Sequence, residues 1–420
     1  MLKRSIGGLL CRQGTHSHSL PFRLNHASAT SATSDLRPDW ASYEEPIAKY
    51  EERPGFLPLV AGQKLGDYTI LRKLGWGVYS TVWLAEREQD RTLAALKVMS
   101  TLGSKHLPEL EFLQRMRSQS PAHPGSSHVA HLIDHFYCSQ GAQDNLCLAL
   151  EPLSESLHTF SKRWIGSRLP PGVVRRVVRQ VVQAVDFLHT ECNIIHTDIK
   201  PDNIMLAISS AELRAAIAAM DGTPVDRSVT QDGREVVRTP SSPIAYPIPP
   251  GDICADETWR GVQGKLSDLG VSCWADRTGG HFMEPIQSPA LRAPEVCIGA
   301  GWGRPADIWS IGCLAYQLSM GRSLLPETIA EVSVPSIHAI LFGEYPEDLL
   351  KSGKHSRMFY LEDGTLRYKE NVRISVAEMV KRDSPADAEL LIDFLNTVFV
   401  LDPAHRPTAK ELLKHKWLSL

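Results

Sequence analysis

Three polar residues stand at short, fixed intervals within an otherwise apolar stretch of the chain. Asp198, Lys200 and Asn203 lie in the segment Ile194-Ile-His-Thr-Asp-Ile-Lys-Pro-Asp-Asn-Ile-Met-Leu206. The apolar runs on both sides predict short buried strands, which would hold the polar residues between them in a rigid loop. In such a loop an aspartate can accept a hydroxyl proton, a lysine can neutralise a transferred phosphoryl group, and an asparagine can bind Mg²⁺. These residues therefore indicate phosphoryl transfer to a hydroxyl group.

A glycine-rich turn precedes this segment. Gly75-Trp-Gly-Val-Tyr-Ser80-Thr-Val82 lies between two expected strands, and its backbone amides can donate to phosphate groups. Ser80 stands where a third glycine is usual, which permits a tight turn but leaves less room above the phosphates. Taken alone, the segment is a weak signal, and the turn of an ordinary hairpin is its more frequent explanation.

A lysine and a glutamate further along can complete a phosphate site. Lys97 lies in an apolar run fifteen residues after Val82 and can bind phosphate if a carboxylate holds it. The expected helix His106–Arg117 offers Glu109 and Glu111. We favour Glu109, because apolar residues one and two turns later then lie on the same helical face. A solvated surface lysine is the alternative reading of Lys97 by itself.

Further motifs follow in a fixed order. Asp268, in Leu266-Ser-Asp268-Leu-Gly270, can bind a metal ion. An isolated Asp-x-Gly sequence is usually a simple turn, but this one comes after Asn203 and before Ala293-Pro-Glu295. The later motifs are Asp307-Ile-Trp309 and Asp402-Pro-Ala-His-Arg406.

The order of these motifs resembles the eukaryotic protein kinase family over residues 67–418. Within that range, four segments look like the SR-protein kinase group, whose members phosphorylate serines in Arg-Ser repeats of splicing factors. These segments are Leu74–Leu84, His196–Pro201, Ile298–Gly301 and Pro305–Trp309. That group carries an insert between the catalytic loop and the metal-binding motif, and here Asp198 and Asp268 are 70 residues apart.

The resemblance implies a bilobal α+β fold, with a small lobe of five strands and one helix, a larger helical lobe, and ATP with Mg²⁺ between them. The implied catalytic residues are Asp198, Lys200, Lys97 and Glu109. The implied nucleotide-binding residues are Leu74, Gly75, Gly77, Ser80, Val82, Ala95, Lys97, Glu151, Leu153, Asn203 and Asp268, of which Asn203 and Asp268 bind the metal. The resemblance also implies that Leu150 is the gatekeeper, that Glu151–Leu153 is the hinge, that Arg406 pairs with Glu295 and that Asp307 supports the catalytic loop.

A pseudokinase scaffold that binds a partner protein is the alternative to an active serine/threonine kinase. Pseudokinases usually lack at least one of four residues that are all present here. These are Lys97, Asp198, Asn203 and Asp268. A metabolite kinase is disfavoured because Ala293-Pro-Glu295 belongs to a peptide-binding activation segment. Tyrosine specificity is disfavoured because Asp198-Ile-Lys200 has the serine/threonine form.

The chain before the kinase-like region divides into two parts. Residues 1–40 form a basic, Ser-rich tail with no acidic residue before Asp35, which is typical of a mitochondrial presequence, and an ordinary disordered tail is the alternative. Residues 41–66 form an N-terminal extension.

Two lobes follow. The small lobe is expected at 67–152, with strands at Tyr68–Leu74, Thr81–Glu86, Leu93–Met99, Val129–Tyr137 and Leu146–Leu150. The large lobe is expected at 153–418, with long helices at Pro170–Thr190, Ala306–Leu318 and Pro385–Leu395. Within it, residues 208–262 predict a Pro-rich insert that is extended or disordered, apart from a short helix at Ala211–Met220.

Composition narrows the classes of partner. The net charge of −3 gives no reason to expect direct nucleic-acid binding, and no apolar run is long enough to cross a membrane. The eight cysteines include no CxxC pair, which argues against a zinc site and against a secreted disulfide framework. We expect a monomer that acts on protein substrates with a Ser or Thr acceptor, basic or Arg-Ser-rich. By resemblance it works in the cytoplasm and nucleus, whereas the tail suggests the mitochondrion.

Two departures from the family pattern predict regulation and specificity. Thr197 replaces the arginine that binds an activation-loop phosphate in many kinases, so we expect constitutive activity. The stretch Pro326–His338 has few of the acids with which SR-protein kinases hold basic tracts, so we expect substrates other than long Arg-Ser repeats. The alternative is that Glu344, Glu347 and Asp348 supply the missing charge.

Overall fold

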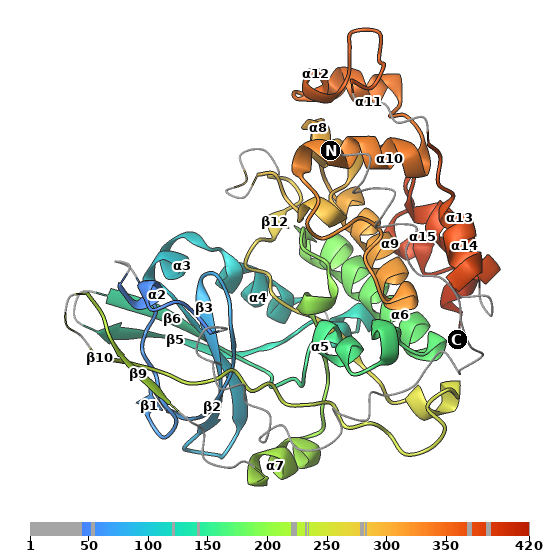
Figure 1. Ribbon diagram of the computed structural model, residues 1–420. Helices are drawn as coiled ribbons and strands as arrows, with labels where there is room; N and C mark the ends of the chain where they lie inside the picture. Colours follow the sequence, from blue (N-terminus) through green and yellow to red (C-terminus); the bar gives the residue numbers. More distant parts are fainter. Residues whose placement is uncertain are drawn as a thin grey trace.

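The protein folds into two lobes, a β-rich small lobe and a helical large lobe (Figure 1). The computed structural model describes residues 44–51, 55–119, 122–140, 143–219, 225–231, 233, 235–277, 281, 284–367, 372–383 and 388–419. The bilobal α+β fold that the sequence predicts is therefore confirmed. The basic tail, residues 1–40, lies outside the described residues.

The small lobe is built on a six-stranded antiparallel sheet in the order β1-β2-β3-β4-β6-β5. Its strands are β1 (Lys64–Leu65), β2 (Tyr68–Trp76), β3 (Ser80–Arg87), β4 (Leu93–Met99), β5 (Leu132–Gln140) and β6 (Gln143–Leu150). The prediction of five strands was wrong by one. The extra strand, β1, has only two residues and pairs with Thr69 and Tyr68, so it is too short to show a period in the sequence.

The helical part of the small lobe also differs from the single predicted helix. It consists of α3 (Thr101–His106) and α4 (Glu109–Ser118). Leu107 is extended and Pro108 precedes α4 as its N-cap residue. The break falls there because the residue before a proline is disfavoured in the helical conformation.

The N-terminal extension is part of the same folded unit as the small lobe. It contains the short helix α2 (Ala48–Glu51). Leu57 and Leu59 are buried in one core with Trp83, Leu96 and Val98, on the face of the sheet opposite to Lys97. Residues before Asp67 therefore stabilise the sheet.

The large lobe centres on two long helices, α6 (Pro171–Phe187, continued by a π-helical turn to Cys192) and α9 (Pro305–Met320). The other helices are α5 (Leu157–Lys162), α8 (Pro294–Ile298), α10 (Val334–Phe342), α11 (Glu347–Ser352), α12 (Ser356–Phe359), α13 (Val376–Asp383), α14 (Ala388–Val398) and α15 (Ala409–Leu412). No described helix has both the length and the apolar character needed to cross a membrane.

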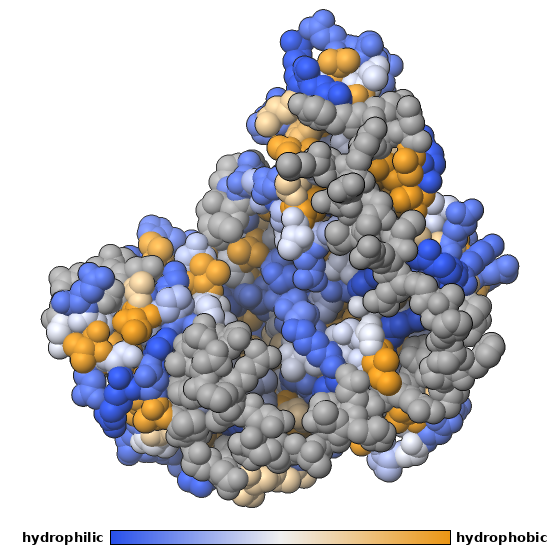
Figure 2. Space-filling model, viewed as in Figure 1, coloured by the Kyte–Doolittle hydropathy of each residue, from blue (hydrophilic) through white to orange (hydrophobic). Residues whose placement is uncertain are grey.

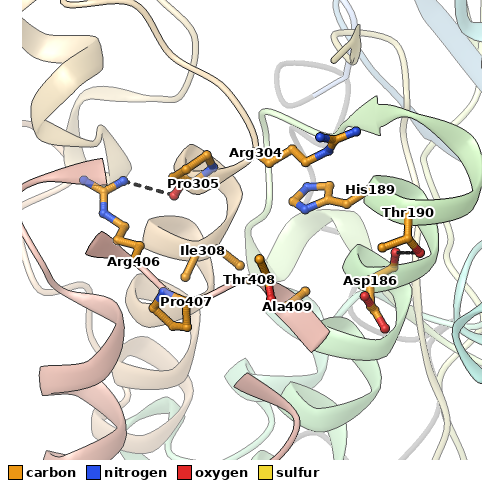
Figure 3. Close-up of a pocket in the computed structure, with 10 residues that line it drawn as sticks. All are labelled: Asp186, His189, Thr190, Arg304, Pro305, Ile308, Arg406, Pro407, Thr408 and Ala409. Atoms are coloured by element: carbon orange, nitrogen blue, oxygen red, sulfur yellow. Dashed lines mark hydrogen bonds between the residues drawn. The ribbon is translucent and has the colours of Figure 1, made fainter. Parts of the chain in front are cut away.

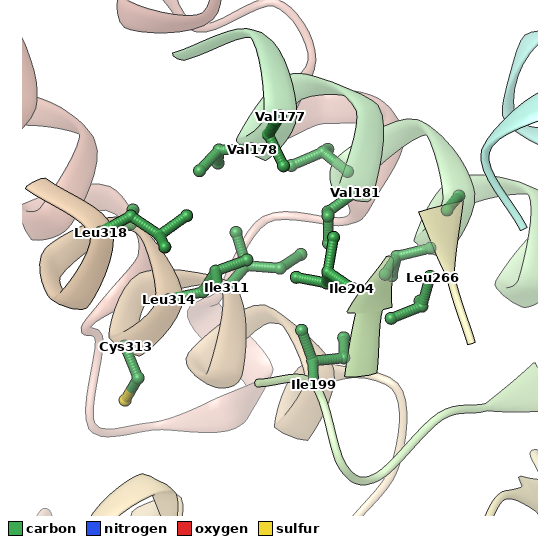
Figure 4. Packing of buried hydrophobic residues seen from close by; sticks show 14 of the residues in the cluster. Val177, Val178, Val181, Ile199, Ile204, Leu266, Ile311, Cys313, Leu314 and Leu318 are labelled. Atoms are coloured by element: carbon green, nitrogen blue, oxygen red, sulfur yellow. The ribbon is translucent and has the colours of Figure 1, made fainter. Parts of the chain in front are cut away.

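Two small antiparallel sheets of two strands each carry the catalytic segments. Strand β7 (Ile194–Ile195) pairs with β12 (Cys273–Trp274), and β8 (Ile204–Leu206) pairs with β11 (Gly264–Leu266). Figure 4 shows side chains of α6 and α9 packed against residues of these segments. They include Val177, Val181, Ile311, Leu314, Ile199, Ile204 and Leu266. This dry packing holds the loop between β7 and β8 as one rigid unit.

The insert at 208–262 is more ordered than the sequence predicts. It contains α7 (Ser210–Ala218), the hairpin of β9 (Asp226–Val229) and β10 (Glu235–Arg238), and a 3₁₀ turn at Asp256–Trp259. In Figure 1 its described part (green to yellow) passes along the small lobe and returns to the large lobe. The predicted helix is present and residues 239–249 form no regular secondary structure, but the described residues are packed rather than disordered.

Burial explains this order. Leu213 and Ile244 pack in one cluster with Leu84 and Leu93 of the small lobe. Trp259 is fully buried, and its ring centre lies 5.8 Å from that of Trp164 in the large lobe. A Pro-rich composition shows only that the insert cannot be a long helix. Whether the scattered apolar residues of the insert become buried depends on the surfaces that the two lobes present to them.

Candidate active site

The loop between β7 and β8 brings the three polar residues together. Asp198 Oδ2 lies 2.8 Å from Lys200 Nζ and accepts a hydrogen bond of 2.8 Å from Asn203 Nδ2. The same Asn203 amide donates to the Asp198 carbonyl at 2.8 Å. The carboxylate of Asp198 is thus held in one orientation, and its second oxygen is left to accept a proton from a substrate hydroxyl.

A buried aspartate from α9 supports this loop from below. Asp307 accepts hydrogen bonds from the amides of His196, at 2.8 Å, and Thr197, at 2.9 Å. His189 Nε2 lies 2.9 Å from the same carboxylate. Burial would raise the pKa of Asp307, but the hydrogen bonds from His189 and His196 outweigh it and lower that pKa. The charged carboxylate therefore fixes the backbone immediately before Asp198.

His196 joins the catalytic loop to the metal-binding motif. Its Nδ1 accepts a hydrogen bond from the Asp198 amide at 3.2 Å, so we assign the ring proton to Nε2, which lies 3.0 Å from the Ser267 carbonyl. The Ser267 amide donates in turn to the Asn203 carbonyl at 2.8 Å. These bonds bring Asp268, the next residue, beside Asn203.

Thr197 has an unusual backbone conformation that its side chain helps to maintain. Its φ is +70°, which is costly for a β-branched residue. The Thr197 hydroxyl donates to the Val271 carbonyl at 2.6 Å, and the Ser272 hydroxyl donates to the His196 carbonyl at 3.2 Å. Two hydroxyl groups therefore connect the catalytic loop directly to the activation segment.

Lys97 links the small lobe to the metal-binding motif. Its Nζ lies 2.7 Å from both carboxylate oxygens of Glu109 and 2.9 Å from Asp268 Oδ1. Glu109 is buried and Glu111 is exposed, so α4 presents to Lys97 the glutamate that the sequence analysis favoured.

Electrostatics keeps Lys97 and Asp268 charged. Burial alone would lower the pKa of Lys97, but the carboxylates of Asp268 and Glu109 raise it. Lys97 lowers the pKa of Asp268 to about 2. Burial raises the pKa of Glu109, and Lys97 counteracts that rise. A charged Asp268 is the state that a hard divalent cation requires.

The glycine turn joins β2 and β3 above this trio. The Gly77 amide donates to the Ser80 carbonyl at 2.8 Å, which closes the turn, and Ser80 itself is buried. A Cβ atom added at Gly75 would meet no atom within 4 Å. Space for a bound group therefore remains beside the turn.

The other predicted nucleotide contacts lie on the strands beneath this turn. Val82 and Ala95 share the face of the sheet that carries Lys97. Leu74 was predicted to contact the nucleotide, and it packs against the cluster that includes Leu213 and Ile244 of the insert. The insert thus reaches the edge of the nucleotide-binding face.

At the predicted hinge, the side chain of Glu151 pairs with Lys265 and does not remain available to a nucleotide. Lys265 Nζ lies 2.7 and 2.8 Å from its two carboxylate oxygens, and the His131 amide donates to it at 2.9 Å. Any contact of Glu151 with a nucleotide must therefore come from its backbone. Among the described residues, the Leu153 amide has no hydrogen-bond partner, which suits a hinge that pairs with an adenine ring.

These residues fit a nucleotide with a divalent cation. Asp268 and Asn203 provide two oxygen ligands, and Mg²⁺ typically takes only one or two protein ligands, with phosphates and water completing its sphere. The described residues contain no separate cluster of three or more His, Cys, Asp or Glu side chains arranged for a metal.

The end of the activation segment is anchored by a buried ion pair. Arg406 Nη1 and Nη2 each lie 2.7 Å from an oxygen of Glu295, and the guanidinium lies 5.1 Å from the ring centre of Trp309. Both side chains are essentially inaccessible to solvent. The structure thus contains the pairing of Arg406 with Glu295 that the resemblance implied.

A cavity of about 400 Å³ borders these supporting groups (Figure 3). It lies between the end of α6, the start of α9 and residues 406–409, and its lining includes Asp186, His189 and Arg304. In Figure 3 one dashed line joins Arg406 to the Pro305 carbonyl, a bond of 3.0 Å. The cavity shares no lining residue with the predicted nucleotide site.

Sequence reasoning missed His189 and Lys265. Each is a single charged or titratable residue whose partner, Asp307 or Glu151, lies more than 100 positions away. Their positions in the sequence were the available signal. His189 lies in the last turns of the helix before the catalytic loop, and Lys265 lies shortly before the metal-binding motif.

Comparison with known proteins agrees with this geometry. The protein kinase domain family matches residues 68–216 and 255–418. The chain is 28% identical to protein kinase dsk1 of Schizosaccharomyces pombe, over 90% of this chain and 87% of that protein. It is 28% identical to serine/threonine-protein kinase SRPK of Physarum polycephalum, covering 88% and 90%, and 27% identical to human SRSF protein kinase 3, covering 87% and 88%.

A solved kinase domain has the same fold. It superposes with a TM-score of 0.63 at 21% sequence identity, over 87% of this chain and 99% of that one. The matched family spans most of the chain, and the conserved order of motifs is assembled into one site. The chain therefore belongs to the eukaryotic protein kinase family, as a serine/threonine protein kinase of the SR-protein kinase-like group.

Proposed function

We propose that the protein is a catalytically active kinase that transfers the γ-phosphoryl group of ATP to Ser or Thr residues of proteins. The observation that carries this proposal is the position of Lys97, which contacts Glu109 and Asp268 at once. A pseudokinase scaffold has no need for a buried lysine, two carboxylates and an ordered Asp198 in one arrangement.

Each residue has a distinct task in this proposal. Asp198 orients the substrate hydroxyl and accepts its proton as the oxygen attacks, and Lys200 neutralises negative charge beside it. Lys97 holds nucleotide phosphates while Glu109 holds Lys97. Asp268 and Asn203 would bind Mg²⁺, which supplies positive charge to the phosphates. The protein contributes mainly position and electrostatics.

Replacing Asp198 by Asn tests this function. The variant keeps the hydrogen bond from Asn203 but loses the proton acceptor. We expect unchanged nucleotide binding and a loss of phosphoryl transfer by several orders of magnitude. The measurement is transfer of radiolabelled phosphate to a peptide library and to the protein itself. If wild type transfers none and Asp198→Asn behaves identically, the scaffold reading is correct.

We infer also that activity does not depend on phosphorylation of the activation segment. The contacts of Thr197 with Val271 and of Ser272 with His196 connect this segment to the catalytic loop through neutral hydroxyl groups. In kinases that an added phosphate activates, charged pairs with arginine make such a connection. Thr197 cannot form such a pair.

The preferred substrates, in our proposal, are proteins with isolated basic residues around the acceptor. The stretch Pro326–His338 contains two acids. Glu331 lies 3.4 Å from Arg292, and Glu327 accepts a hydrogen bond from Ser323 at 3.3 Å. Each acid therefore already has a partner within the protein, and two carboxylates are few for holding a long basic tract.

Two of the three alternative acids, Glu347 and Asp348, lie on α11 and are also paired. Glu347 lies 2.7 Å and Asp348 3.9 Å from Lys351. Figure 2 shows the projection formed by α11 and α12 covered mainly by hydrophilic residues, and these have mixed charge. A surface of mixed charge holds a long positive tract less well than a purely acidic groove.

Two further proposals concern context. We propose that the protein is a monomer in the cytoplasm and nucleus, as the resemblance implies. The mitochondrial alternative depends on residues 1–34, which lie outside the described residues.

A further inference from the structure

Lys73 is a buried lysine next to the glycine turn that the proposed mechanism does not use. It lies on β2, directly before Leu74 and Gly75, and its side chain is 0% exposed. Its Nζ contacts Glu44 at 2.8 Å, Glu45, and the Thr239 carbonyl at 3.2 Å. All three protons of the ammonium group can therefore be donated.

The pairing of β2 with β3 is irregular on both sides of Lys73. The register shifts between Ile70 and Arg72 and again between Lys73 and Gly75. An interrupted ladder fixes the path of a strand less firmly than a continuous one. The position of the chain entering the glycine turn therefore depends on other contacts.

Those contacts come from the N-terminal extension and from the insert. The Ser242 amide of the insert donates to the Lys73 carbonyl at 3.0 Å. Glu44 accepts hydrogen bonds from the amide and hydroxyl of Ser241, the latter at 2.7 Å. We call Glu44, Glu45, Lys73, Arg238, Thr239, Ser241 and Ser242 the clasp.

The remaining contacts of the clasp make it continuous. Arg238 Nη1 donates to the Glu45 carbonyl at 3.0 Å, and its Nη2 lies 2.6 Å from Asp226 of β9. The Tyr50 hydroxyl of α2 donates to Glu45. Nearly every polar group around Lys73 thus has a partner from a different segment of the chain.

The clasp also connects the glycine turn with the large lobe. Four residues beyond Ser242, the insert is anchored by Glu155, which precedes α5. The Tyr246 amide donates to its carboxylate at 2.8 Å, and the Glu155 amide donates to the Ile244 carbonyl at 2.7 Å. The insert therefore spans the two lobes between Lys73 and Glu155.

The chemistry of the clasp favours positioning over simple stabilisation. Apolar residues of similar volume usually stabilise a core as well as a buried ion pair does, whereas charged groups with several hydrogen bonds accept only one arrangement. Lys73 makes such contacts with two distant segments, between the two places where the β2–β3 ladder is interrupted.

We propose that Lys73 is a positioning residue for the glycine turn, through which the extension and the insert set the affinity for nucleotide. Lys73 touches no substrate in this proposal; it fixes the path of β2 into Gly75 and Gly77. The inference rests on the proposed function, because it assigns the turn to nucleotide binding.

The test compares full-length variants by nucleotide binding, hydrogen exchange and steady-state kinetics. Lys73→Met keeps the length of the side chain and removes its charge. The matched control is Lys64→Met, because Lys64 is 70% exposed and pairs with Glu88 at the edge of the same sheet. The measurements are the Kd for a fluorescent ATP analogue, hydrogen exchange of the peptide covering residues 74–82, the KM for ATP, kcat, and Tm.

We expect Lys73→Met to raise the Kd and the KM for ATP by about fivefold or more, to change kcat by less than about twofold, and to speed exchange in the turn. Lys64→Met should change none of these. The combination Lys73→Met, Glu44→Gln and Glu45→Gln removes the unpaired carboxylates and should recover Tm, while Kd and exchange stay altered.

Two results would overturn the proposal. One is a Lys73→Met variant that lowers Tm but leaves the Kd for the analogue and the exchange of the turn as in wild type. The other is a triple variant in which Tm, Kd and exchange all return to wild-type values. Failure of the proposed function is recognised separately, since wild-type protein would then transfer no phosphate to any peptide or to itself. Exchange in the turn would still report whether Lys73 positions it.

Discussion

Lys97 Nζ and Asp268 Oδ1 lie 2.9 Å apart although 171 residues separate them in the chain. The contact joins β4 of the small lobe to the metal-binding motif of the large lobe. It exists only when both lobes and α4 are in place, so it reports the assembly of the whole site.

Activity should survive phosphatase treatment. Thr197 and Ser272 hold the catalytic loop without a phosphate, so complete dephosphorylation should leave kcat within about twofold. Thr197→Val keeps the β-branched shape but loses the bond to Val271, and we expect a tenfold lower kcat, about 1.4 kcal/mol, with unchanged KM for ATP. Abolition of activity by phosphatase, checked by mass spectrometry, would refute the prediction.

Long Arg-Ser repeats should offer no strong advantage. The comparison is kcat/KM for a peptide of eight Arg-Ser repeats against a single-site serine peptide with isolated basic residues. Each missing surface carboxylate contributes only about 0.2–1 kcal/mol, but several act together on a repetitive ligand. A preference for the repeat above about tenfold, or 1.4 kcal/mol, would show that other acids supply the groove.

Breaking the pair of Arg406 with Glu295 should destabilise the large lobe strongly. Glu295→Gln leaves a buried guanidinium without its carboxylate, at a cost of about 3–5 kcal/mol in the free energy of unfolding. The control is Glu362→Gln, because Glu362 is 86% exposed and lies 3.6 Å from Arg357, so its loss should cost less than about 1 kcal/mol. Urea unfolding of both variants checks the difference, and equal costs would contradict it.

Acid should destabilise the protein through His338. Burial, and secondarily the charge of Arg406, lower the pKa of His338 to about 3. Its Nδ1 lies 2.6 Å from the Tyr345 hydroxyl, and its ring packs against Trp309. The unfolded chain binds a proton near the ordinary histidine pKa and the folded protein does not. The contribution of neutral His338 to the free energy of unfolding is therefore fully present above about pH 6.5. It falls as the pH drops towards 3, by up to about 1.4 kcal/mol per pH unit.

The variant His338→Gln isolates this effect. Glutamine can still bond to Tyr345 but does not titrate in this range. The free energy of unfolding, measured by urea at pH 5 and pH 7.5, should differ less between the two pH values in the variant than in wild type. An unchanged difference would mean that His338 is not the responsible group.

The N-terminal tail should direct a reporter to mitochondria if it is a presequence. A fusion of residues 1–34 to a fluorescent protein should then enter the organelle, and the mature N-terminus should fall before Trp40. Substitution of Lys3, Arg4, Arg12 and Arg23 by Gln is the matched control and should abolish import. A diffuse or nuclear reporter would reject the presequence and keep the disordered-tail interpretation, with the protein in the cytoplasm and nucleus.

The sequence by itself determined the catalytic loop and the order of the motifs. Asp198, Lys200 and Asn203 lie within six residues of each other, so a single loop conformation brings them together once apolar runs pin its ends. The same local logic gave the choice of Glu109 over Glu111, because helical periodicity decides which of two nearby residues faces the sheet. The main strands were likewise readable from their β-branched and aromatic residues.

Tertiary structure alone decided the supporting contacts. The chain has 45 basic and 48 acidic residues, so sequence allows far too many pairings to predict that Lys73 meets Glu44 and Glu45, or that Lys265 meets Glu151. The ordered insert is a second case, because residues such as Leu213 become buried only if another lobe offers a complementary surface. Local propensity acts over a few residues, whereas burial and long-range ion pairs depend on how distant segments meet.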